Sequence, residues 1–157
     1  MMSSALGAGV IGTLAMTTII KTATEMGITR MDFALLLGTV FTDNRRKARA
    51  VGYGLYFLLG VAFAEAYAAF FAIVGRGSWQ LGALLGALHA IFVATVLVTV
   101  LLPVVHPRMA TPDTAANDVT LIEPPGFLLL NYGRSTFVVI LVAHITYGAL
   151  VGMIVHP

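Results

Sequence analysis

The chain has 157 residues, of which 59% are hydrophobic and only 10% are charged. Soluble domains carry about 25% charged residues, so this composition is typical of a membrane protein and not of a domain surrounded by water. The formal net charge of +2 gives no indication of nucleic-acid binding, and the absence of cysteine excludes disulfides, thiolate metal sites and iron–sulfur clusters.

A helix that crosses a bilayer needs about 20 predominantly apolar residues. The chain contains four such stretches, at about residues 4–26, 50–74, 81–104 and 135–155. No lysine or arginine precedes Lys21, so the first stretch lacks the basic region of a secretory signal, and we expect it to be retained as a span. The pattern predicts one all-α integral membrane domain, residues 1–157, with four transmembrane helices.

A further apolar stretch, at about residues 31–41, is too short to cross a bilayer. Thr29 and Asp32 lie at its start with the spacing of helix-capping residues, which predicts a short helix that is interfacial or re-entrant. The last link between spans, at about residues 105–134, is a long loop.

The basic residues predict how the chain is oriented in the membrane. Eight of the nine lysines and arginines flank the first and third links between spans, and only Arg76 lies in the second link. By the positive-inside rule, the first link and the loop of about residues 105–134 are cytoplasmic, and both termini lie outside. The densest basic cluster is also a candidate site for anionic lipid headgroups. It consists of Arg45, Arg46, Lys47 and Arg49.

Three spans each carry one ionisable residue at membrane depth: Glu65, His89 and His144. Such residues are costly in a bilayer and usually face the protein interior. Each shares a helix face with small residues, and two of these faces contain GxxxG pairs, Gly82–Gly86 and Gly148–Gly152, which allow close helix packing. We therefore expect the three side chains to turn inward, where they can form a Glu–His–His cluster.

The sequence leaves three interpretations of this cluster open. In the first, which we favour, the side chains bond one another or backbone carbonyls and fix the helix packing. In the second they form a proton or ion relay. In the third they bind a cofactor: a divalent metal held by Glu65, His89 and His144, or a haem held by His89 and His144. No metal-binding spacing such as HxxxH supports one cofactor over the other.

Other motifs do not indicate an enzyme. Gly7–Gly12 matches the dinucleotide-binding pattern, but it has no preceding strand, so helix packing explains its glycines better. His106, at the end of the third span, is expected to be a surface histidine. We identify no catalytic residues, and an enzyme would have to use loop acids such as Asp113, Asp118 or Glu123.

Five short elements of the C-terminal half form a recognisable set: Gly82–His89, His106–Met109, Pro125–Phe127, Asn131–Gly133 and His144–Gly148. Together they resemble small bacterial four-span inner-membrane proteins of uncharacterised function. The resemblance implies a place in the bacterial cytoplasmic (inner) membrane and implies no activity.

These observations predict a small integral membrane protein that serves as a structural or accessory subunit of a membrane assembly or a homo-oligomer. The alternative is a proton- or ion-coupled transporter that uses the intramembrane Glu/His cluster. A second alternative is a membrane redox component that binds haem or a metal. Expected partners are the lipid bilayer and either further copies of the chain or a larger membrane-protein complex.

Overall fold

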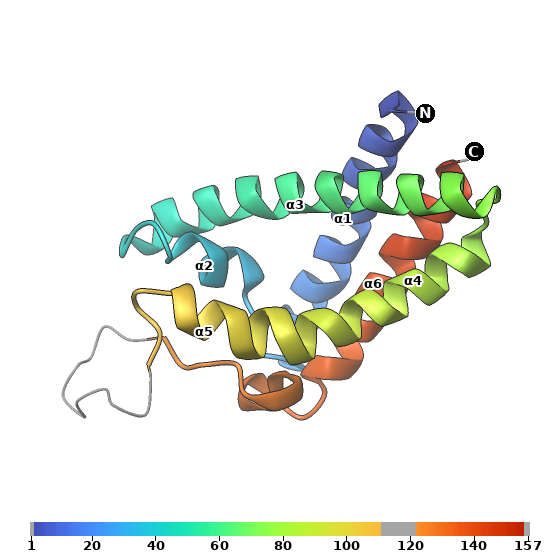
Figure 1. Cartoon of the computed structure of the whole chain (residues 1–157). Helices are drawn as coiled ribbons and strands as arrows, with labels where there is room; N and C mark the ends of the chain where they lie inside the picture. The colour runs from blue at the N-terminus through green and yellow to red at the C-terminus, as the bar shows by residue number, and fades with distance from the viewer. Residues whose placement is uncertain (1, 111–121, 156–157) are drawn as a thin grey trace.

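The computed structural model describes residues 2–110 and 122–155 of the chain (Figure 1). Within these residues, four helices are long and apolar enough to span a membrane, and shorter helices connect them. The predicted all-α fold class is therefore confirmed. The loop acids Asp113 and Asp118 lie outside the described residues.

The helices follow one another in an order close to the predicted one. They are α1 (Met2–Glu25), α2 (Phe33–Gly38), α3 (Arg45–Val74), α4 (Trp79–Phe92), η1 (Val93–Leu101), α5 (Leu102–Val105), η2 (Phe127–Tyr132) and α6 (Thr136–Ile154). The helix α3 begins earlier than the predicted start near residue 50. The reason is a helix cap, because the Asn44 side chain accepts hydrogen bonds from the amides of Arg46 and Lys47.

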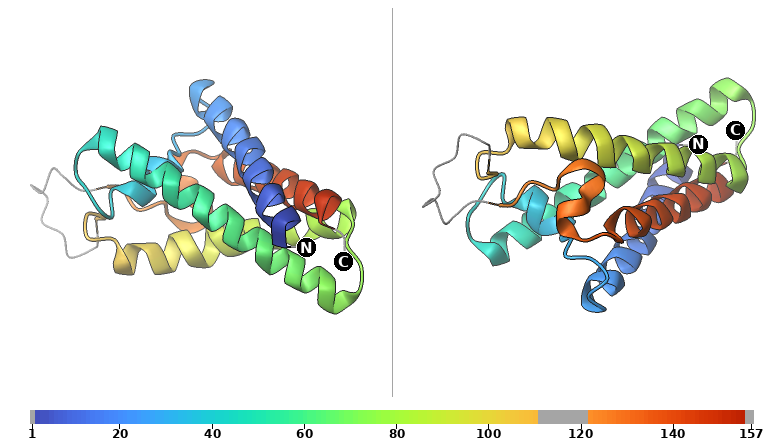
Figure 2. Two further views of the ribbon diagram at one scale, coloured as in Figure 1. Left: turned by 90° about the horizontal axis from the view of Figure 1, so that it is seen from above. Right: turned by 90° about the horizontal axis from the view of Figure 1, so that it is seen from below.

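The third span consists of α4, η1 and α5 in one continuous run, Trp79–Val105. Figures 1 and 2 show α3 and this run as two arms that meet at a tight turn and diverge toward their other ends. The two arms make little direct backbone contact. Instead, α6 packs along α4 and against α1, α1 also packs against α3, and α2 lies against the beginning of α3.

The contact between α4 and α6 is made by glycines. A Cβ atom added to Gly82 would lie 2.0 Å from the carbonyl oxygen of Gly148, and one added to Gly86 would lie 2.2 Å from that of His144. A side chain on either glycine would collide with the backbone of α6. The two GxxxG pairs therefore pack against each other within the molecule and bring the two helix backbones into contact.

The middle of the third span, η1, is a π-helix, which the sequence analysis did not foresee. Pro103 lies two residues beyond its end, has no amide hydrogen to donate, and crowds the carbonyl four residues before it. A wider turn ahead of the proline relieves that crowding. The Thr99 hydroxyl donates to the carbonyl of Ala94, five residues earlier, at 2.6 Å and so occupies one backbone acceptor of this segment.

The link after α5 is fastened to α2 by His106 and Arg108. Nε2 of His106 donates to the carbonyl of Leu36 at 3.1 Å, and Nδ1 accepts from the amide of Arg108 at 3.2 Å. The Arg108 guanidinium donates to the carbonyls of Thr39 and Val40 just after α2. His106 is only 4% exposed, so the expectation of a surface histidine was wrong. Its burial has a function in packing, because it holds α2 beside the third span.

Candidate functional site

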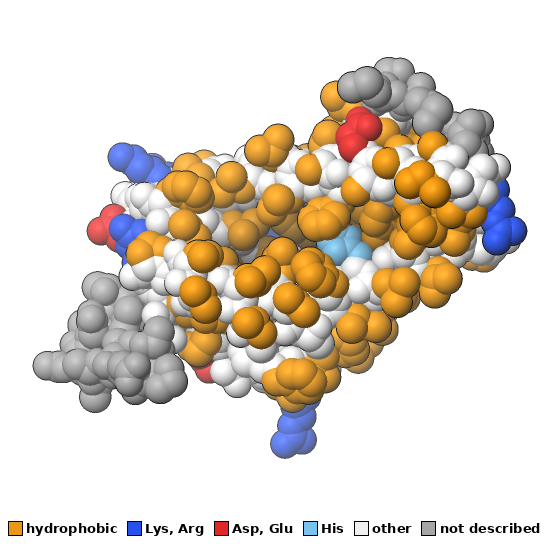
Figure 3. Space-filling view, viewed as in Figure 1, with side chains coloured by type: hydrophobic (Ala, Val, Ile, Leu, Met, Phe, Trp, Pro, Cys, Tyr) orange, Lys and Arg blue, Asp and Glu red, His pale blue; other side chains and the backbone are white. Residues whose placement is uncertain are grey.

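An apolar groove lies between α3 and the third span, where the two arms diverge (Figure 3). We call it the lateral groove. Its volume is about 250 Å³. Apolar side chains from α2, α3 and η1 form most of its lining, among them Phe33, Leu37, Leu59, Phe63, Leu97 and Leu101. Figure 3 shows it as a hollow between two bands of hydrophobic side chains, with a histidine at one end.

The lateral groove opens onto the apolar surface of the spans. Three residues of its lining, Leu59, Leu101 and Val105, are 41%, 51% and 67% exposed. In a helix that crosses a bilayer, exposed apolar side chains of this kind face lipid acyl chains and not water. The groove is therefore accessible to molecules that are dissolved in the membrane.

His89 and His144 lie together at the inner end of the lateral groove. Their ring centroids are 4.9 Å apart and the rings are nearly perpendicular, at 82°. The close approach of α4 and α6 produces this pairing, because Gly86 rests on the backbone carbonyl of His144. The Phe63 ring also packs against His89, with a centroid distance of 4.0 Å.

Glu65 is not part of this cluster. Among the described residues, no three histidine, aspartate or glutamate side chains lie close enough together to hold a metal ion. The buried face of α3 runs through Gly60, Ala64, Tyr67 and Ala68, and Glu65 lies beside that face, only partly buried. The predicted Glu–His–His cluster is thus wrong for Glu65. The sequence pattern put Glu65 on the face of small residues. In the structure, the face of α3 that is buried against α1 and α6 is the neighbouring one.

The hydrogen bonds of His144 determine which of its nitrogens carries the proton. Nδ1 lies 2.8 Å from the carbonyl oxygen of Ile140, and a carbonyl can only accept, so Nδ1 is the donor. In the neutral ring, Nε2 is then a free acceptor. It makes no hydrogen bond with any described residue. The side chain is 4% exposed, and it lines the lateral groove.

The partner of His89 is a hydroxyl instead of a carbonyl. Nδ1 of His89 lies 3.3 Å from the hydroxyl of Tyr67. If that hydroxyl donates, the proton of the neutral ring lies on Nε2, which is then a donor; if it accepts, the proton lies on Nδ1. Nε2 is buried and has no partner among the described residues.

Tyr147 is a residue of the site that the sequence analysis missed. Its hydroxyl donates to the carbonyl of Gly60, which ties α6 to α3 beside the two histidines. Its ring packs on α1, where a Cβ atom at Gly12 would lie 2.7 Å from it. The signal in the sequence was weak: Tyr147 follows His144 by three residues and so shares its helix face.

The histidine pair does not fit the predicted haem. Ligation by two histidines requires an iron about 2 Å from each nitrogen, with the flat macrocycle between the rings. The rings of His89 and His144 are instead in edge-to-face contact. A divalent metal would find only two imidazole nitrogens here, fewer than the three or four protein ligands that most zinc sites use.

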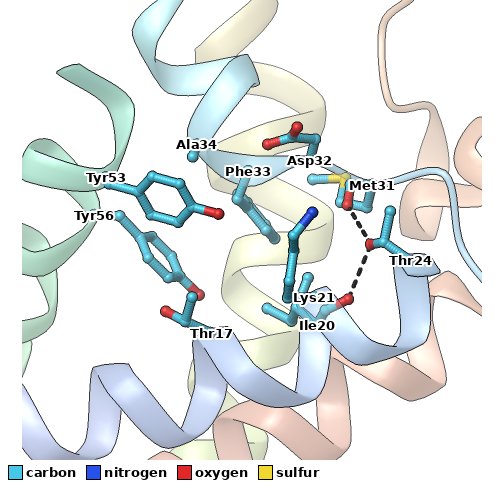
Figure 4. Close-up of a pocket in the computed structure, with 10 residues that line it drawn as sticks. All are labelled: Thr17, Ile20, Lys21, Thr24, Met31, Asp32, Phe33, Ala34, Tyr53 and Tyr56. Carbon is cyan, nitrogen blue, oxygen red and sulfur yellow. Dashed lines mark hydrogen bonds between the residues drawn. The ribbon is translucent and has the colours of Figure 1, made fainter. Parts of the chain in front are cut away.

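A smaller pocket of about 30 Å³ lies at the basic end of the bundle (Figure 4). The hydroxyls of Thr17 and Tyr56 line it, and neither has a partner among the described residues. Figure 4 shows these side chains directed toward each other from α1 and α3, with Lys21 nearby. The pocket has room for one water molecule, which two such hydroxyls would bind. Tyr56 and Phe33 also line the lateral groove and so separate it from this pocket.

The candidate headgroup site lies at the beginning of α3. Arg45, Arg46 and Lys47 are exposed there. Arg49 is also exposed, but its Nε donates to Oδ2 of Asp32 at 3.1 Å, so it is partly engaged within the chain. Lipid binding by these residues stays a prediction.

No family model, no curated protein and no solved structure matches the chain. Its four long apolar helices nevertheless determine its class. The chain is a small integral membrane protein. Its more specific function has to be inferred from the lateral groove and the groups at its inner end.

Proposed function

We propose that the lateral groove binds a small molecule dissolved in the bilayer, with an apolar chain or ring and one polar group. A single observation carries the proposal. The groove is apolar, opens on the lipid-facing surface, and ends at two histidines, each with one ring nitrogen that lacks a partner among the described residues. Ligand sites usually combine these features: an apolar lining and a few convergent polar groups.

The size of the lateral groove is compatible with a small molecule. Its volume is about 250 Å³. Small-molecule pockets begin at about 300 Å³, so a ligand that keeps part of its chain in the bilayer fits this volume.

The free energy of burying the imidazoles also favours a ligand with a polar group. An unsatisfied buried donor or acceptor costs about 1–3 kcal/mol. A lipid tail cannot bond to His89 or His144, and thus leaves this cost in place. A molecule that carries a polar group to the inner end of the groove removes it, and that gain would hold the ligand there.

The experiment is photolabelling of the protein in phosphatidylcholine nanodiscs with a diazirine-bearing fatty alcohol. Mass spectrometry then maps the labelled peptides. We expect labelling of groove residues such as Phe63 and Leu97. The variant Leu59→Trp places a larger side chain in the mouth of the groove and should weaken binding about tenfold, which corresponds to roughly 1.4 kcal/mol.

The matched control is Leu58→Trp, the same change at the neighbouring residue. Leu58 is 66% exposed and is not among the residues that line the groove. Labelling of the groove should survive this substitution. Labelling that spreads evenly over the lipid-facing surface, and that responds equally to both variants, would show that the groove has no ligand of its own.

The structure bears differently on the hypotheses of assembly with other proteins, homo-oligomerisation and a proton or ion relay. Association with a larger assembly stays a prediction. Homo-oligomerisation also stays a prediction, and it would use surfaces other than the GxxxG pairs, because α4 and α6 bury those pairs against each other. A relay through Glu65, His89 and His144 loses the proximity on which it depended.

A further inference from the structure

The two imidazoles at the inner end of the lateral groove differ in what they offer a ligand. Nε2 of His144 is an acceptor, because Nδ1 uses its proton on the carbonyl of Ile140. The Tyr67 hydroxyl can donate to Nδ1 of His89, and Nε2 of His89 is then a donor. The rings are in contact, with centroids 4.9 Å apart, and both histidines line the groove.

We propose that the ligand's polar group is an un-ionised hydroxyl, carried by a lipid-soluble alcohol or phenol. This inference rests on the proposed function of the groove. A hydroxyl donates one hydrogen bond and accepts others, so it donates to Nε2 of His144 and accepts from Nε2–H of His89. Both imidazoles are then satisfied by a single atom of the ligand.

Other polar groups satisfy the pair less well. A ketone or ester oxygen only accepts, so it bonds His89 and leaves His144 without a partner. A phosphate or carboxylate brings a charge into a groove lined almost entirely by apolar side chains, and no lysine or arginine is among its lining residues. A hydrocarbon leaves both nitrogens unpaired, as the bilayer itself does.

The tautomers can be tested without knowing the ligand. Nitrogen NMR of histidine-labelled protein in nanodiscs distinguishes a protonated ring nitrogen from a bare one. We expect His144 to carry its proton on Nδ1 and His89 to carry its proton on Nε2. Two rings in the same tautomer, or a doubly protonated ring, would overturn the inference, because the donor–acceptor pair would not exist.

Competition tests the ligand class directly in the wild-type protein. Dodecanol, a ketone of the same chain length and dodecane are added at equal mole fraction in the bilayer, and displacement of the photolabel from groove residues is measured. Dodecanol should displace it about tenfold more effectively than either of the others, because only it pairs both nitrogens. The variant His144→Phe keeps a ring but removes the acceptor, and should abolish the preference for dodecanol over the ketone.

The outcomes separate the two proposals. Equal displacement by all three molecules would overturn the hydroxyl inference and leave the groove as a ligand site. Failure of the photolabel to reach the groove at all would overturn the proposed function as well. Stronger displacement by the ketone than by dodecanol would show that His144 is not an acceptor for the ligand.

Discussion

Tyr147 connects three spans at one side chain. Its hydroxyl bonds the carbonyl of Gly60 in α3, and its ring lies against Gly12 of α1 and meets Tyr67 edge-on at a centroid distance of 5.8 Å. A buried tyrosine needs a partner for its hydroxyl, and the carbonyl of Gly60 provides one. Residues of this kind set the positions of His89 and His144.

His106 should make the stability of the protein depend on pH. Burial lowers its pKa below the ordinary value of about 6.5, although its bond to the Leu36 carbonyl opposes this shift. The unfolded chain therefore takes up a proton at a higher pH than the folded protein does. Stability is complete above pH 6.5 or so and falls as the pH drops below it.

The measurement is the free energy of unfolding at about pH 7.5 and about pH 5.5. His106 should account for a loss of at most about 1.4 kcal/mol over this range. The variant His106→Gln can keep both hydrogen bonds but does not titrate, so the difference between the two proteins isolates this group. An identical pH dependence in both would contradict the argument.

At the scale of helices, the contact between α4 and α6 depends on having no side chains at its glycines. The same contact brings the two groove histidines together, so packing and the candidate site are coupled. The π-helix η1 forms one wall of the lateral groove. Residues spaced four apart along this run, Val93, Leu97 and Leu101, line the lateral groove on the side opposite α3.

Replacing Gly86 with alanine should loosen this contact. The new Cβ atom would lie 2.2 Å from the carbonyl oxygen of His144, so the helices must separate. We expect a loss of about 1–3 kcal/mol in the free energy of unfolding, the usual cost of overpacking. Unfolding in sodium dodecyl sulfate can be followed by the fluorescence of Trp79, the one tryptophan in the sequence.

Gly54→Ala provides the matched control in α3. A Cβ atom at Gly54 would meet nothing within 4 Å, so this substitution should be neutral or slightly stabilising. Gly86→Ala should also reduce photolabelling of the lateral groove, because it moves His89 away from His144. Equal stability of the two variants would show that the α4–α6 contact is less tight than described.

At the scale of the whole molecule, the lateral groove exists because α3 and the third span diverge from their common turn (Figure 1). The helix α2 fastens the far end, through its packing on α3 and its bonds to His106 and Arg108. The helix α1 packs against α3, and α6 packs against α4. The arrangement of all the spans therefore leaves the groove open on one side.

The predicted orientation can be tested with single cysteines, because the chain has none of its own. Asp43→Cys lies in the first link, and Gln80→Cys lies at the turn between the arms; both residues are exposed. A membrane-impermeant maleimide should label Gln80→Cys on intact cells. It should label Asp43→Cys only after the membrane is opened. The reverse pattern would invert the predicted topology.

The sequence by itself determined the class of the protein, the approximate spans and the glycine faces of α4 and α6. These properties are local, since hydropathy adds up residue by residue and the GxxxG spacing lies within a single helix. For the same reason the sequence identified His89 and His144 as residues of interest. It did not distinguish them from Glu65, which looked equivalent within its own span.

Only the tertiary structure decided which of these residues meet. The choice between neighbouring faces of α3 depended on α1 and α6, and it separated Glu65 from the histidine pair. The tautomers of His89 and His144 depend on Tyr67 in another helix and on the carbonyl of Ile140. The groove itself is the space between elements far apart in the sequence, so no local pattern of residues encodes it.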